Sequence, residues 1–123
     1  MATTVLFALA FSVYAETLSI PANSSTYTST KNSSAPGSQY YAKTVSASYT
    51  GMPSGYVPSD GTFTFTLYTS GGLVAGQSKT AGIGVPVYPS VNTFYQTHSG
   101  DYKLLVRNNA ASNGTTANVA WNP

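Results

Sequence analysis

Strict alternation of apolar and polar residues is the feature that most restricts how this chain can fold. It is clearest in residues 62–68, TFTFTLY, where Phe63, Phe65 and Leu67 form one row and polar or amphipathic residues form the other. Successive side chains of a β-strand point to opposite faces, so the pattern predicts a strand with one buried face and one wet face. A helix of this sequence would scatter its apolar residues around the axis.

Similar segments recur along the chain, separated by residues that favour turns. In residues 101–108 the inward row is Tyr102, Leu104 and Val106, and in residues 39–50 one row is expected to hold Tyr41, Lys43, Val45, Ala47 and Tyr49. Gly, Pro, Asn and Asp cluster between these segments, as expected for turns. The strands predicted in this way cover residues 17–20, 39–50, 62–68, 73–75, 79–87, 91–97, 101–108 and 117–121. Residues 16–38 include a Ser/Thr-rich stretch that we expect to be loosely held, either as a flexible leader or as an edge strand near residues 26–30.

Seven or eight short strands with short connections predict an all-β fold, an antiparallel β-sandwich of immunoglobulin-like or jelly-roll-like type. Two stacked sheets would bury the apolar rows between them. A closed barrel fits less well, because the strands differ in length and prolines mark several edges.

A short motif near the C-terminus supports the sandwich. Residues 99–102, SGDY, open the strand that begins at Asp101. The motif resembles the turn-Gly-x-Tyr that opens a late strand in immunoglobulin-like domains, where the tyrosine forms a corner. The resemblance covers four residues and lacks the cysteines and central tryptophan of those domains, so it implies the architecture and no family membership.

Residues 1–15 differ from the rest of the chain. They carry no charge, contain an apolar run over residues 5–11, and place Val13 and Ala15 at the −3 and −1 positions of a cleavage site. This pattern predicts a secretory signal peptide, with residues 16–123 as a single secreted domain. The basic residues usual at the start of a signal peptide are missing, and a buried core element is the alternative. The run is too short to span a bilayer as a helix.

Composition narrows the function. Charged residues make up 7% of the chain, against about 25% in typical domains, and the net charge of +2 forms no basic run. Nucleic-acid binding and charge-driven membrane attachment are therefore not expected. The chain has no cysteine, and about 100 residues can bury enough surface to fold without disulfides. We expect a bacterial source, because cysteine-free secreted domains are common there.

Catalytic and metal-binding patterns are weak. A Ser-His-Asp arrangement would have to use His98, the single histidine, with Asp60 or Asp101. The same two aspartates are the one carboxylate pair left for glycoside hydrolysis, but both are better explained as turn residues. One histidine, no cysteine and three acidic residues cannot form a standard zinc site. We therefore expect no enzyme activity, no metal and no cofactor.

Tyrosine is the remaining signal, with ten in the chain. Tyr40, Tyr56, Tyr68 and Tyr88 fall on expected outward rows or in loops, where their rings could stack on sugars or pack on a partner protein. The alternative is that they pair across strands and stabilise the sheets. Trp121 is expected to cover the core.

These observations favour a small secreted module that acts by surface contact with a cell-surface protein or a glycan. A self-assembling extracellular matrix protein is the alternative, because low charge and long Thr/Tyr strands would permit self-association. A secreted toxin or inhibitor is a further alternative.

Overall fold

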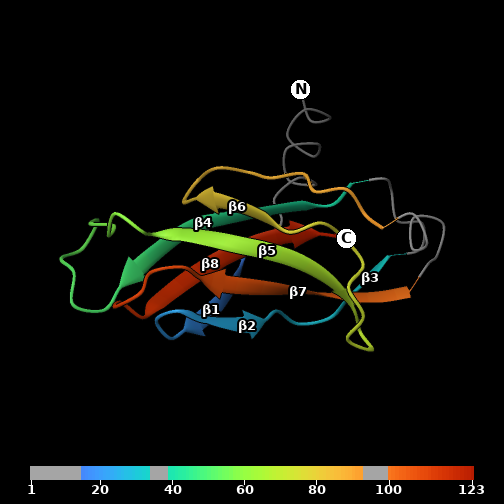
Figure 1. Cartoon of the computed structure of the whole chain (residues 1–123), viewed down its shortest axis with the longest axis horizontal. Helices are drawn as coiled ribbons and strands as arrows, with labels where there is room; N and C mark the ends of the chain where they lie inside the picture. The colour runs from blue at the N-terminus through green and yellow to red at the C-terminus, as the bar shows by residue number, and fades with distance from the viewer. Residues whose placement is uncertain (1–14, 34–38, 93–99) are drawn as a thin grey trace, which may run out of the picture.

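The computed structural model describes residues 15–33, 39–92 and 100–123. Within them the chain forms two antiparallel sheets that pack face to face, which confirms the predicted β-sandwich (Figure 1). No helix in this part of the chain is long and apolar enough to cross a membrane. The described strands are β1 (Glu16–Ile20), β2 (Ser24–Tyr27), β3 (Lys31–Ser33), β4 (Tyr41–Tyr49), β5 (Thr62–Thr69), β6 (Lys79–Gly82), β7 (Gly100–Asn108) and β8 (Thr115–Asn122).

The smaller sheet has the order β1-β8-β4, and the larger has the order β2-β7-β5-β6, with β3 also paired to β7. β2 and β3 lie one after the other along the same edge of β7, where Thr26 is opposite Val106 and Asn32 is opposite Asp101. The Ser/Thr-rich segment is therefore held as two short edge strands where it is described, and residues 34–38 lie outside the described residues.

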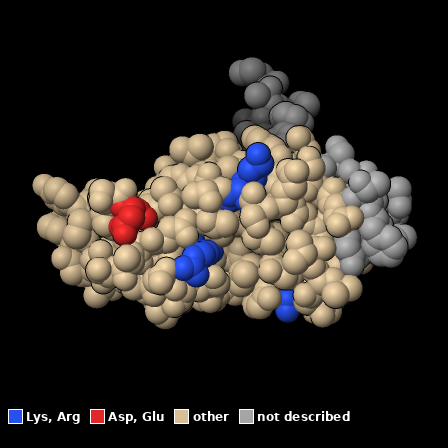
Figure 2. Space-filling view, viewed as in Figure 1, with Lys and Arg blue, Asp and Glu red and all other residues tan. Residues whose placement is uncertain are grey.

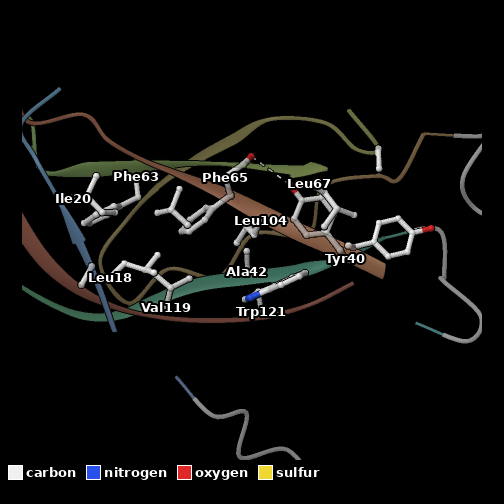
Figure 3. Packing of buried hydrophobic residues seen from close by; sticks show 14 of the residues in the cluster. Leu18, Ile20, Tyr40, Ala42, Phe63, Phe65, Leu67, Leu104, Val119 and Trp121 are labelled. Carbon is white, nitrogen blue, oxygen red and sulfur yellow. Dashed lines mark hydrogen bonds between the residues drawn. The ribbon is translucent and has the colours of Figure 1, made fainter. Parts of the chain in front are cut away.

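The apolar rows of the two sheets meet in one core. Phe63, Phe65 and Leu67 of β5 face Val119 and Trp121 of β8 across the sandwich (Figure 3). Each of these side chains is at most 1% exposed. The inward rows predicted for β5 and β7 are confirmed, and Trp121, which was expected to cover the core, is itself fully buried in it. Burying such side chains is the main favourable term in folding.

β4 departs from the predicted row. Its register against β8 shifts between Thr44 and Ser46, which marks a β-bulge at Val45. Ala42 and Thr44 point inward before the bulge, whereas Tyr49 is the buried residue after it. The prediction that one face runs through the whole strand is wrong, because an extra residue reverses the alternation.

β6 is shorter than predicted. It ends at Gly82, and Gly84 follows with a φ of 82°, a conformation that ends an extended strand. The chain then runs beside β4 as residues 84–92, which we call the linking segment. Its backbone pairs with Ala42 of β4 through Val87, and with Gly76 through Val91. Of the strand predicted at residues 91–97, residues 93–97 lie outside the described part of the chain.

The linking segment closes one side of the sandwich between β4 and the end of β5. On the opposite side the Ser29 backbone N–H and hydroxyl donate to the Glu16 carboxylate at 2.7 and 2.9 Å. On the same side the Lys31 Nζ donates a hydrogen bond to the Trp121 carbonyl at 2.6 Å. The unpaired edges that remain are short, and short edges limit strand addition by another chain.

A buried amide ties the turns at one end of the sandwich. Asn108 is fully buried, and its Nδ2 lies 2.8 Å from the Asn113 carbonyl and 3.3 Å from those of Ile20 and Pro21. Its Oδ1 accepts from the Ala110 N–H at 3.0 Å. One side chain therefore satisfies backbone groups of the β1–β2 and β7–β8 connections.

We predict that Asn108→Ala lowers the free energy of unfolding by at least about 2 kcal/mol, because it leaves several buried backbone groups without a partner. Asn109→Ala is the matched control. Asn109 donates to the hydroxyls of Thr62 and Thr64 at the partly exposed surface, and its loss should cost about 1 kcal/mol or less. Urea unfolding measures both variants, and equal losses would contradict this role for Asn108.

Candidate functional site

The structure does not bring the four predicted tyrosines together. Tyr40 is 2% exposed and packs in the core, so the expectation that it points outward is wrong (Figure 3). Its hydroxyl lies 2.9 Å from the Gln77 carbonyl and 3.3 Å from that of Phe65. The sequence pattern put Tyr40 at the start of a strand. In the structure Gln39 pairs with Ser90 of the linking segment, and the side chain of Tyr40, the next residue, points inward.

Tyr56 and Tyr88 are exposed, as expected, but lie apart. Tyr56 is 63% exposed in the connection between β4 and β5. Tyr88 is 55% exposed in the linking segment, where its ring centroid lies 5.6 Å from that of Tyr41 on β4. Each therefore offers an aromatic surface in a different part of the molecule.

Tyr68 lies on the outer face of the larger sheet, beside a tyrosine distant in sequence. The ring centroids of Tyr68 on β5 and Tyr27 on β2 are 5.7 Å apart with the ring planes at 90°. β7 lies between these strands, with its Leu105 opposite both Tyr27 and Thr66. Edge-to-face packing of this kind fixes the orientation of both rings.

A cation completes this cluster. Lys103 on β7 is opposite Tyr68 in the register, and its Nζ lies 4.1 Å from the centroid of the Tyr27 ring. This distance is favourable for a cation–π interaction. Further along the same row, a guanidinium nitrogen of Arg107 donates to the Asn23 side-chain oxygen. We call Tyr27, Tyr68, Lys103, Leu105 and Arg107 the tyrosine face.

Hydroxyl groups border the tyrosine face on the β5 and β6 side. The Thr64 and Thr80 hydroxyl oxygens lie 2.7 Å apart, and those of Thr66 and Ser78 lie 2.6 Å apart. Both pairs run across the strands on the outer face, because the inner row holds Phe63 and Phe65. Each hydroxyl keeps further hydrogen-bonding capacity toward the solvent.

Tyr27 is the functional candidate that sequence reasoning missed. It lies in the Ser/Thr-rich stretch that was expected to be loosely held, so no row could be assigned to it. The alternation of residues 101–108 did place Lys103, Leu105 and Arg107 on a common outward row. What was missing was the pairing of β2 with β7, which puts Tyr27 beside that row.

The acidic side chains bond to neighbouring groups. Asp60 lies in a turn, as predicted, whereas Asp101 lies within β7 opposite Asn32 and not in a turn. Asp60 accepts from the Ala111 N–H at 2.9 Å, and Asp101 accepts from the Asn32 amide at 2.9 Å. Asp101 lies near the start of the nine-residue β7 and Ala111 lies beyond its end, which separates the two aspartates by roughly 30 Å. A carboxylate pair for glycoside hydrolysis is therefore not formed.

His98 lies outside the described residues, and within them no three His, Cys, Asp or Glu side chains gather as metal ligands.

No protein-family model matches this chain, and no curated protein is significantly similar to it. Function must therefore be inferred from the geometry of the chain's own residues.

The buried position of Tyr40 predicts a loss of stability at high pH. Burial raises the pKa of the Tyr40 hydroxyl well above its ordinary value, whereas the unfolded chain ionises near pH 10. The free energy of unfolding therefore falls as the pH rises above about 10. There the unfolded chain loses the Tyr40 proton, whereas the folded chain keeps it.

Tyr40→Phe should reduce this alkaline loss, at a cost of about 1 kcal/mol at neutral pH for the hydrogen bond. Urea unfolding from about pH 8 to about pH 11 compares the variant with the wild type. Identical pH dependence of the two proteins would contradict the assignment.

Proposed function

We propose that this protein is a secreted, non-enzymatic module that binds a glycan on its tyrosine face. The convergence of Tyr27 and Tyr68 from strands distant in sequence, with Lys103 against the Tyr27 ring, is the observation that carries the proposal. Tyr27 is 43% exposed, which leaves part of its ring accessible to a ligand.

The chemistry of this face suits a sugar. The C–H groups of a pyranose pack on aromatic rings, and its hydroxyls pair with threonine and serine hydroxyls such as those of Thr66 and Ser78. A tyrosine ring loses little conformational entropy on binding, and the edge-to-face contact has already fixed both rings. The face is therefore preorganised for a ligand that needs apolar contact and hydrogen bonds together.

Secretion and the absence of catalysis belong to the same proposal. Residues 1–15 have the pattern of a signal peptide, and the rest of the chain lacks cysteine and has few charges. The carboxylates of Asp60 and Asp101 are far apart and bonded to neighbouring groups, which favours a role in binding over one in hydrolysis.

A glycan array tests the proposal. We expect Tyr27→Ala and Tyr68→Ala each to weaken binding about tenfold or more. Removing an aromatic side chain that stacks on a nucleobase costs about 1–3 kcal/mol, and we expect a similar loss for a sugar ring. Tyr56→Ala and Tyr88→Ala are matched controls, since both remove exposed tyrosines elsewhere and should leave binding unchanged. Full binding by the first two variants, or loss only in the controls, would remove the tyrosine face from consideration.

A second candidate function is contact with a protein. Tyr41 and Tyr88 lie along the β4 edge with Val45 and Val85, which are 47% and 53% exposed. The Gly84 N–H donates to the Thr44 carbonyl, which holds the linking segment against this part of β4. Grouped exposed apolar side chains favour protein contact.

Light scattering distinguishes contact with a second copy, as in a self-assembling matrix protein, from glycan binding by a monomer. We expect a monomer at all concentrations, because the unpaired strand edges are short. If the molecular mass instead grows with concentration, and Val85→Asp abolishes this growth, the result would support assembly through the Tyr41–Tyr88 edge. Ser19→Asp is the control, on an exposed position of β1 at the opposite edge of the same sheet.

A further inference from the structure

The charges on the tyrosine face point to the class of glycan, and this inference rests on the proposed function. We propose that the ligand is an acidic oligosaccharide, which lies along β7 with its anionic groups at Lys103 and Arg107. The two cations are on the same outward row of one strand, with Leu105 between them. Four residues of extended chain separate them by roughly 13 Å, a spacing suited to a short oligosaccharide rather than to a single sugar.

Neither cation is neutralised by a carboxylate. The chain has three acidic side chains, and all are described. Glu16 binds Ser29, Asp60 binds the Ala111 N–H and Asp101 binds Asn32. Lys103 contacts the Tyr27 ring and Arg107 contacts a neutral amide instead. Both cations therefore keep donors that an anionic ligand can use.

The surroundings favour a ligand with spaced charges. In the view with β5 and β7 in front, basic groups stand apart on an uncharged surface, and the acidic atoms in view lie toward the β4–β5 connection (Figure 2). The groups next to the two cations are hydroxyls and rings, such as Thr64 opposite Arg107 and Tyr68 opposite Lys103. An acidic sugar chain presents the same combination of spaced anionic groups, hydroxyls and apolar C–H faces.

Two cations also limit the ligand. A nucleic acid carries a charge on every nucleotide, and proteins that bind it commonly neutralise several phosphates with a continuous basic stripe. The tyrosine face offers two cations on β7 separated by an apolar residue, and the whole chain has five basic residues. A glycan with widely spaced carboxylates or sulfate esters therefore fits better than a polyphosphate backbone.

The test measures binding of the full chain to three immobilised probes: polygalacturonate fragments, dextran sulfate and neutral dextran. We expect tighter binding to an acidic probe than to neutral dextran, and weaker binding to it as salt is raised. The first two probes distinguish carboxylate from sulfate as the anionic group, and preference for either supports the proposal. Lys103→Gln and Arg107→Gln should each weaken acidic binding about tenfold, whereas Lys79→Gln, an exposed lysine on β6, should not.

The outcomes separate this inference from the function on which it rests. Binding to the neutral probe that needs Tyr27 and Tyr68 but is insensitive to Lys103→Gln and Arg107→Gln would overturn the acidic ligand and leave glycan binding intact. Binding to none of the probes, together with a blank glycan array, would overturn both. Tighter binding to single-stranded DNA than to any sugar probe, through the same two cations, would also overturn the proposal. An unchanged thermal unfolding midpoint in each glutamine variant would show that its weaker binding does not result from a loss of folding.

Discussion

The packing of two alternating apolar rows against each other is the interaction on which the rest of this structure depends. Phe65 and Leu104 are fully buried between the sheets, and their burial fixes the register of β5 against β7. A slip of one residue would move the whole apolar row to the solvent side. The core therefore also determines the outer face, because the alternation that buries Leu104 places Lys103 and Leu105 outside.

Polar groups complete the sandwich where this alternation ends. Asn108 satisfies the backbone at the turns of one end, and the Tyr40 hydroxyl bonds to backbone carbonyls beside the linking segment. A buried polar group that lacked such partners would destabilise the fold by more than a hydrogen bond contributes. The outer faces of the sheets do not have to bury apolar side chains. Tyrosines, threonines and cations can therefore occupy them without destabilising the core.

Local pattern predicted the strands in which alternation is unbroken, namely β5, β7 and β8, and it also predicted the inward rows of β5 and β7. It predicted β4 only in part, because the bulge at Val45 depends on pairing with β8, and its sequence carries no sign of an extra residue. It made β6 too long, because Val85 and Val87 continue the apolar row after Gly84 has turned the chain. Tyr40 was misplaced for a related reason, since the linking segment that covers it comes from a distant part of the chain.

The sequence by itself determined the fold class, the faces of the regular strands and the turn role of Asp60, because these depend on side-chain period and local backbone preference. Only the tertiary structure decided which outward residues become neighbours. Tyr27 meets Tyr68 and Lys103 because β2 pairs with the edge of β7 while β5 pairs with its other side. Strand order of this kind is set by how the sheets bury their apolar faces together, and the alternation within a single strand carries no information about it.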